Sequence, residues 1–203
     1  MRLTAETTLE AERYLGRRDP IMGRLIGQYG PSRLHAARRP PFQTLAGAII
    51  GQQLSVKAAA AIEARVRQVL GGPLGAQRLL AAPPDALRAA GLSNAKVRYL
   101  HELAGRVSRR ELNFAALRRC SDAEAAAALV ALPGIGQWTA EMFLIFGLQR
   151  ANVLSLGDAG LRRAATLLYP EFGLEAMGER WQPYCSVASW YLWQSLENAP
   201  LAV

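Results

Sequence analysis

Residues 130–140 read VALPGIGQWTA, and this short stretch decides the fold. It interrupts a series of helical patterns with one proline and two glycines that lie two residues apart. Pro133 fits a tight turn, and Gly134 and Gly136 permit a positive φ at little steric cost. A second helix should begin at about Gln137, so that its unpaired N–H groups and positive dipole end point out of the turn. The stretch therefore predicts two helices joined by a glycine hairpin.

Two interpretations of this hairpin remain open from the residues alone. It is either a device that binds phosphate groups without reading base sequence, or a simple connection between two packed helices. The charge of the chain favours the phosphate-binding interpretation, because the chain has 24 Lys and Arg residues but 16 Asp and Glu residues, for a net charge of +8. Such an excess is typical of proteins that bind nucleic acid. A genome that favours arginine codons would give the same excess on an ordinary surface.

The remaining composition narrows the class of protein. The longest apolar runs are far too short to span a membrane, and the N-terminus lacks the apolar stretch of a signal peptide, so we expect a cytoplasmic protein. Cys120 and Cys185 are expected to be separate thiols. With only His35 and His101 besides, these residues can assemble neither a zinc site nor an iron–sulfur cluster.

Helical periodicity runs through the whole chain. One stripe of apolar residues recurs at the spacing of a buried helical face, Ser93 is placed to cap a helix, and Ser121 with Glu124 forms a capping-box sequence. No stretch alternates apolar and polar residues, so we predict an all-α fold. The stripe consists of Phe42, Leu45, Ala46, Ile49 and Ile50.

Five segments occur in this order along the chain: IIGQQLSVKAAAAI, GLSNAKVRYL, LPGIGQWTAEMF, LSLGDAGLRRA and ERWQPYCSVASWYLW. Together they resemble the helix–hairpin–helix plus Gly/Pro-Asp (HhH-GPD) superfamily of DNA glycosylases, and within it the 3-methyladenine DNA glycosylase II branch. The resemblance implies a two-lobed helical fold with the active site in the cleft between the lobes. One lobe would comprise residues 36–150 and the other residues 1–35 and 151–203. Larger bacterial members carry an N-terminal β domain, which we expect this chain to lack.

The resemblance places the catalytic carboxylate at Asp158, one of four aspartates in the chain. From the residues alone, a helix cap explains Asp158 equally well, as capping explains Asp85 and Asp122 at two other expected helix starts. A carboxylate suits the chemistry, because cleavage of an N-glycosidic bond develops positive charge on the sugar. A fixed anion stabilises that charge and can orient the attacking water.

Bifunctional members of the superfamily carry a nucleophilic lysine where this chain has Trp138. The resemblance therefore implies a monofunctional hydrolase that needs no cofactor for catalysis. It also gives Trp138 and Trp193 base-stacking roles, with Trp190 and Tyr191 as lesser candidates. Core packing is the alternative for each of these aromatic residues. Met142 stands where an aromatic residue is common, which leaves the substrate range open.

The resemblance assigns further residues to DNA. Gln53, or Leu54 as the second candidate, would insert into the space left by a flipped base, although polar loop residues are usually just solvated. Gly134 and Gly136 would offer main-chain N–H groups to a phosphate, and Thr139 its hydroxyl. A sodium or potassium ion would bind the main-chain carbonyls of three hairpin residues. These are Val130, Leu132 and Ile135.

The sequence thus predicts a monomeric enzyme that flips alkylated purines out of double-stranded DNA and hydrolyses them away, leaving an abasic site. One alternative is a related glycosylase for deaminated or other damaged bases. Another is a non-catalytic helix–hairpin–helix module that only binds DNA, which the presence of Asp158 and Trp193 disfavours. Gly157 and Cys185 depart from the residues common at their positions.

Overall fold

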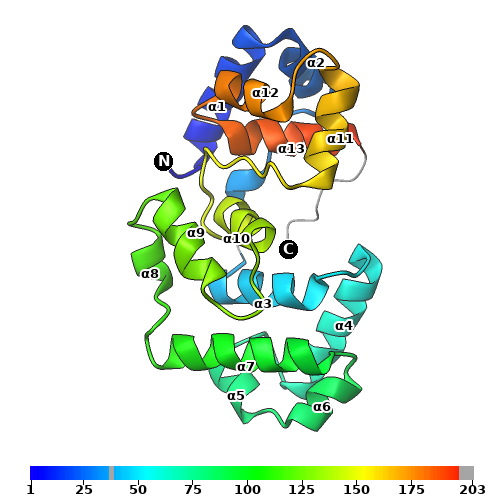
Figure 1. Ribbon diagram of the computed structural model, residues 1–203, viewed down its shortest axis with the longest axis vertical. Coiled ribbons are helices and arrows are strands. Elements are labelled where there is room, and N and C mark those ends of the chain that lie inside the picture. Colours follow the sequence, from blue (N-terminus) through cyan, green and yellow to red (C-terminus); the bar gives the residue numbers. More distant parts are fainter. Residues whose placement is uncertain (37–38, 197–203) are drawn as a thin grey trace. The chain divides into compact units, whose positions relative to one another are not determined.

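The computed structural model describes residues 1–36 and 39–196, and in this part of the chain it confirms the all-α prediction. The regular elements there are helices (Figure 1), and the β pairing is one isolated bridge between Arg2 and Arg150. No helix within the described residues is both long and apolar enough to cross a membrane.

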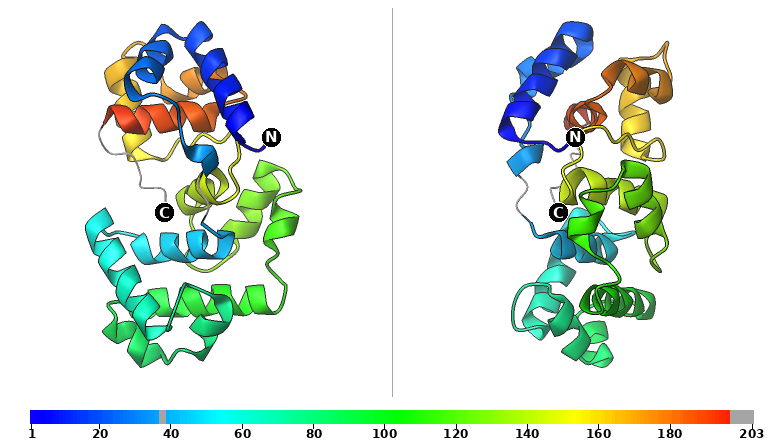
Figure 2. Two further views of the ribbon diagram at one scale, coloured as in Figure 1. Left: turned by 180° about the vertical axis from the view of Figure 1, so that it is seen from behind. Right: turned by 90° about the vertical axis from the view of Figure 1, so that its left-hand side faces the viewer.

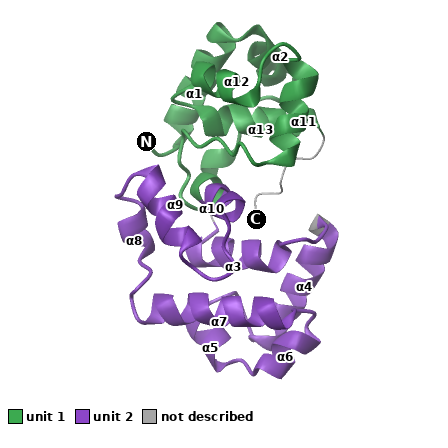
Figure 3. Ribbon diagram, viewed as in Figure 1, with its two compact units in different colours: residues 1–38, 144–202 green, residues 39–143, 203 purple. Residues whose placement is uncertain are grey.

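The described chain divides into two compact units, shown in different colours in Figure 3. Unit 1 contains residues 1–36 and 144–196, and unit 2 contains residues 39–143. Each unit therefore has its own core, and the chain passes from one to the other at the short π-helix η2 (Phe143–Gly147).

Unit 1 is built around its last helix, α13, which is apolar on nearly all sides and buried, as expected of a central helix. In the right-hand view of Figure 2, α1 and α2 lie on one side of α13, and α11 and α12 lie on the other. The helices of this unit are α1 (Ala5–Arg18), α2 (Pro20–Tyr29), η1 (Leu34–Ala36), α11 (Ala159–Leu168), α12 (Leu174–Trp181) and α13 (Cys185–Ser195).

Unit 2 carries the hairpin. Its helix α7 packs against α3, α5 and α6, and α9 packs against α10. Leu45, Ala46, Ile49 and Ile50 on α3 are completely buried, which confirms four of the five residues of the predicted stripe, whereas Phe42 is half-buried. The helices are α3 (Pro41–Gly51), α4 (Val56–Val69), α5 (Ala76–Ala81), α6 (Pro84–Ala89), α7 (Asn94–Ser108), α8 (Phe114–Leu117), α9 (Asp122–Val130) and α10 (Gln137–Met142).

The predicted caps are mostly confirmed. Ser93 caps α7, and Ser121 with Glu124 forms the capping box of α9. Capping does not explain Asp85 and Asp122, however, because the N-cap residues there are Pro83 and Ser121. Both aspartates lie in the first helical turn, where a negative charge still favours the helix dipole.

Candidate functional site

The hairpin turn, residues 131–136, follows α9 and ends where α10 begins at Gln137, as predicted. The Ile135 N–H donates to the Leu132 carbonyl at 3.1 Å, which closes a four-residue turn around Pro133 and Gly134. Gly134 has φ 81°, the value that a type II turn requires at its third residue. A Cβ atom there would also overlap the ring of Tyr99. Glycine is thus required by both the backbone and the packing.

Gly136 does not use the conformational freedom that glycine permits. Its φ of −87° and ψ of 173° are extended backbone that any residue adopts. A Cβ atom added at Gly136 would nevertheless meet nothing within 4 Å. The missing side chain leaves open space beside the N-terminus of α10, so another molecule can approach the main chain.

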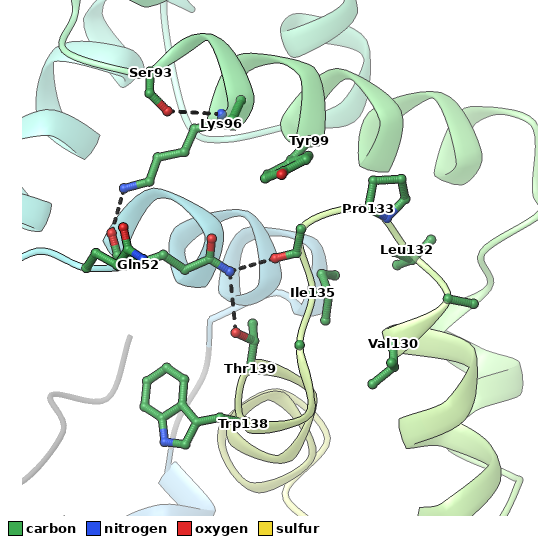
Figure 4. A pocket seen from close by; sticks show the side chains of 15 residues that line it. Gln52, Ser93, Lys96, Tyr99, Val130, Leu132, Pro133, Ile135, Trp138 and Thr139 are labelled. Carbon is green, nitrogen blue, oxygen red and sulfur yellow. Dashed lines mark hydrogen bonds between the residues drawn. The ribbon is translucent and has the colours of Figure 1, made fainter. Parts of the chain in front are cut away.

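A hollow of about 880 Å³ lies over the hairpin turn within unit 2 (Figure 4). It brings together segments far apart in sequence: the end of α3, the start of α7, and the hairpin with α10. Leu54 follows Gln53 in the sequence but does not line the hollow. Leu54 is 38% exposed. The predicted residues that line the hollow are Gln53, Val130, Leu132, Gly134, Ile135, Gly136, Trp138 and Thr139.

These lining residues differ in how accessible their side chains are. Trp138 is 45% exposed, so a large part of this residue is accessible at the hollow. Gln53 is exposed and has φ 58°, so it forms the bend after α3. Thr139 is buried, and its hydroxyl lies 3.4 Å from the amide nitrogen of Gln52. The hydroxyl thus already has a neighbour inside the protein.

Three side chains connect the segments around this hollow, and the sequence reasoning did not single them out. The Gln52 amide donates to the Gly134 carbonyl at 2.7 Å. The Lys96 ammonium donates to the carbonyls of Ile50 at 2.8 Å and Gln52 at 2.7 Å. Tyr99 lies against Gly134. Lys96 and Tyr99 belong to one of the five quoted segments, but only the fold shows what their side chains contact.

Asp158, in unit 1, is the N-cap residue of α11 and is only 8% exposed. Its Oδ1 accepts hydrogen bonds from the Leu161 N–H at 2.7 Å and from the indole N–H of Trp193 at 3.0 Å. The capping interpretation is confirmed. The catalytic interpretation is compatible with it, because a helix N-terminus and an indole donor both suit a fixed anion.

Trp193 is 2% exposed, and its ring stacks on Phe146 with 5.8 Å between ring centroids. A Cβ atom added at Gly160 would lie 3.1 Å from Asp158 Oδ1 and 3.4 Å from the Trp193 ring. The carboxylate and the indole are therefore packed tightly against the first turn of α11. In this arrangement Trp193 positions Asp158, and its base-stacking role stays a prediction.

The other proposed pocket residues lie mainly in the cores of the two units. Tyr191 is completely buried and donates to Glu12 and to the Gly30 carbonyl, both at 2.9 Å. Burial raises its pKa. Trp190 packs edge-on against Tyr191, with 4.8 Å between ring centroids, and Met142 is buried at the end of α10. Their assignment to a base pocket gains no support from these contacts.

Cys120 and Cys185 are separate thiols and not a disulfide, as expected. Cys185 is buried, its thiol donates to the Gly178 carbonyl at 3.3 Å, and burial raises its pKa to about 11. It is therefore a packed, protonated thiol at neutral pH. Within the described residues, no group of three or more His, Cys, Asp or Glu side chains could hold a metal ion.

Residues 46–173 match the family model described as "HhH-GPD superfamily base excision DNA repair protein". The chain belongs to the HhH-GPD superfamily. The matched residues include the hairpin, Trp138 and Asp158, whereas Trp193 lies outside the matched range.

Solved HhH-GPD structures show the same likeness. A DNA-3-methyladenine glycosidase from Bacillus halodurans is 38% identical, with a TM-score of 0.73 over 87% of this chain and 89% of that one. The Schizosaccharomyces pombe 3-methyladenine DNA glycosylase Mag1, solved in complex with abasic DNA, is 28% identical. Its TM-score is 0.80, and the match covers 93% of this chain and 97% of that one.

A curated relative is the Escherichia coli DNA-3-methyladenine glycosylase 2, which is 33% identical over 157 residues. The match covers 72% of this chain but 54% of that protein. The chain thus spans about half the length of this curated relative.

Proposed function

We propose that this chain is a monofunctional DNA glycosylase that hydrolyses alkylated purines from double-stranded DNA and leaves an abasic site. It acts as a monomer on DNA in the cytoplasm and needs no cofactor for catalysis. The names of its HhH-GPD relatives support the substrate class. The observation that carries the proposal is the buried Asp158, oriented on α11 by a main-chain N–H and the Trp193 indole.

The fixed carboxylate of Asp158 serves the chemical step. Departure of the base leaves positive charge on the deoxyribose, and an anion held in place lowers the energy of that state without having to reorganise. The same carboxylate orients the attacking water and accepts its proton. Because the two donors to Oδ1 are held by α11 and α13, this anion is already oriented before substrate arrives.

Unit 2 binds the substrate DNA. Main-chain N–H groups of the hairpin turn, from Gly134 to Gly136, contact a phosphate. The approach is open at Gly136, where an added Cβ atom would meet nothing within 4 Å. Gln53, with Leu54 beside it, fills the space left by the flipped nucleotide. Trp138 offers an exposed aromatic face that favours a positively charged alkylated purine.

A sodium or potassium ion at the hairpin would bind the main-chain carbonyls of Val130, Leu132 and Ile135. Carbonyl oxygens are ligands that such hard cations accept. The donor set fits, because the Leu132 carbonyl accepts one turn hydrogen bond and a carbonyl oxygen has two lone pairs. When bound, the ion would add positive charge near the phosphate contact.

The deciding experiment measures base release from methylated duplex DNA under single-turnover conditions, with the wild type and Asp158→Asn compared. We expect the wild type to free 3-methyladenine or 7-methylguanine, and the variant to be slower by about a hundredfold or more. Binding to DNA with an abasic-site analogue should be retained, because the hairpin is unchanged.

Two results would overturn the proposal. If both proteins bind DNA but neither releases a base from methylated, deaminated or oxidised duplexes, the chain is a non-catalytic DNA-binding module. If bases are released but borohydride traps a covalent protein–DNA adduct, the enzyme is a lyase and not a monofunctional hydrolase. Release of deaminated bases alone would shift the substrate class and leave the role of Asp158 standing.

A further inference from the structure

Residues 52–54, which we call the wedge loop, and the hairpin turn are separated by about eighty residues of sequence but are joined by side chains in unit 2 (Figure 4). Helix α7 contributes to both. Lys96 contacts the wedge loop, and Tyr99, three residues further along α7, lies against the hairpin turn at Gly134. One face of α7 therefore contacts the two loops that the proposed function assigns to DNA.

Lys96 ties the wedge loop to α7. Its ammonium donates to the carbonyls of Ile50 and Gln52, at the point where α3 ends. The last carbonyls of a helix lack internal partners and carry partial negative charge, so a cation is well placed there. Lys96 makes no ion pair within the described residues. Partial burial lowers its pKa.

Gln52 ties the same loop to the hairpin turn. Its amide donates to the Gly134 carbonyl at 2.7 Å and lies 3.4 Å from the Thr139 hydroxyl. Gly134 in turn has no room for a side chain, because Tyr99 fills that space. The wedge loop is thus held from two directions, while Gln53 at its tip stays exposed.

We infer that Lys96 and Gln52 are positioning residues that fix the wedge loop to the hairpin turn. Gln53 can then insert into a duplex without displacement of the loop. Lys96 acts through the two carbonyls it holds and is not itself a phosphate ligand. The inference rests on the proposed function, because it gives the wedge loop a task only if a base is flipped.

The physical reason is mechanical. Flipping a nucleotide out of a duplex opposes stacking and pairing, so the inserting residue needs a rigid support. Single-stranded DNA offers no opposing strand and little stacking to overcome. A loosened wedge loop should therefore slow excision from duplex DNA much more than excision from a single strand of the same sequence.

The test compares Lys96→Met and Gln52→Ala with the wild type, using methylated DNA in duplex and single-stranded form. We expect each variant to lower the duplex-to-single-strand ratio of excision rates by about tenfold, as expected for loss of hydrogen bonds with a charged or buried partner. The matched control is Lys57→Met, which removes an exposed lysine at the start of α4, just after the wedge loop. Its ratio should equal that of the wild type.

A second measurement does not depend on excision. Fluorescence of 2-aminopurine placed opposite an abasic-site analogue rises when a wedge unstacks it, and this rise should be reduced in both variants at saturating protein. The dependence of binding on salt separates positioning from direct contact. Loss of a phosphate ligand lowers the slope of log K against log salt by about 0.9, whereas we expect Lys96→Met to leave that slope unchanged.

Several outcomes would overturn the inference. They are an unchanged excision ratio, an equal loss on both substrates, an unchanged fluorescence rise, or a reduced salt slope for Lys96→Met. If Lys96→Met does not fold, Gln52→Ala carries the test, because its side chain lies at the surface of the hollow. A wild type that releases no base but still raises the fluorescence would refute the proposed function and leave this inference standing.

Discussion

Asp19 and Asp158 each begin a helix of unit 1, and each accepts a hydrogen bond from a tryptophan indole. Asp19 is 2% exposed, and its two oxygens share four donors. Oδ1 accepts from the main-chain N–H groups of Ile21 and Met22, and Oδ2 accepts from the Tyr169 hydroxyl at 2.8 Å and from Trp181 at 3.0 Å. This carboxylate is a structural junction between α2, the end of α11 and α12.

The surroundings of Asp158 are different. The carboxylate is 8% exposed, and glycines lie close to it on both sides in sequence. Gly160 is packed tightly against Oδ1, whereas a Cβ atom at Gly157 would meet nothing within 4 Å. The carboxylate is thus oriented on one side, while the main chain just before it borders open space.

A cap with an indole partner is therefore not by itself a catalytic signature. The same local motif stabilises the core at Asp19, where four donors bind the two oxygens. At Asp158 it orients a carboxylate that the proposed function makes catalytic. Substitutions at the two aspartates and at their neighbours separate these roles.

Replacement of each carboxylate by an amide should change a different property, and the loss of excision rate at Asp158 should be the largest change. Asp158→Asn should slow excision by about a hundredfold or more and change stability little, because asparagine is also a good N-cap residue. Asp19→Asn should lower the free energy of unfolding by about 1–3 kcal/mol, since its amide would face two donors. Single-turnover excision and urea unfolding measure both. Equal loss of activity in the two variants, at full folding, would end the distinction.

The indole donors to the two aspartates, Trp193 and Trp181, can be replaced in the same way. Trp193→Phe retains an aromatic ring beside Phe146 but removes the donor to Asp158, so we expect about tenfold slower excision, the equivalent of one hydrogen bond to a charged group. Trp181→Phe should instead lower the free energy of unfolding by about 2 kcal/mol and leave the excision rate of the folded protein unchanged. Normal excision by Trp193→Phe would show that the indole does not orient the carboxylate.

The two glycines provide a matched pair. Gly160→Ala places a methyl group against Asp158 Oδ1 and the Trp193 ring, so it should displace the carboxylate and slow excision several-fold, because a shift of about 1 Å in a catalytic group is costly. Gly157→Ala enters open space and should leave the thermal midpoint of unfolding at the wild-type value. If Gly160→Ala is as active as the wild type, the tight packing has no role in orientation.

The smallest effect depends on pH. Burial, and then the neighbouring Asp19, raise the pKa of Tyr169. An unfolded tyrosine ionises at about pH 10, so the contribution of the protonated hydroxyl is complete below that pH. Above pH 10 this contribution to the free energy of unfolding decreases by up to about 1.4 kcal/mol per pH unit. Tyr169→Phe should therefore be less stable than the wild type at pH 8, and the difference should shrink above about pH 10. Urea unfolding at several pH values checks this, and a constant difference would contradict the assignment.

Much of unit 2 follows from local sequence. The Pro-Gly pair predicts the turn, Ser93 and Ser121 predict helix starts, and the apolar stripe of α3 predicts a buried face, because each depends on residues a few positions apart. The sequence left the backbone angles of Gly136 open, because a glycine permits unusual angles but does not require them. The structure gives it extended backbone as the N-cap residue of α10.

Local sequence patterns predict the helical class, the hairpin and the helix that begins with Asp158, and the motifs identify the family. The side-chain donors to Asp19, the Trp193 donor to Asp158, and the contacts of Lys96 and Gln52 are visible only in the folded structure. These contacts join residues that are 35 to 162 positions apart. The Gln52–Gly134 and Lys96–Gln52 pairs fall within that range. Periodicity and caps report only on neighbours along the chain, whereas a side chain acquires its partners when the helices pack.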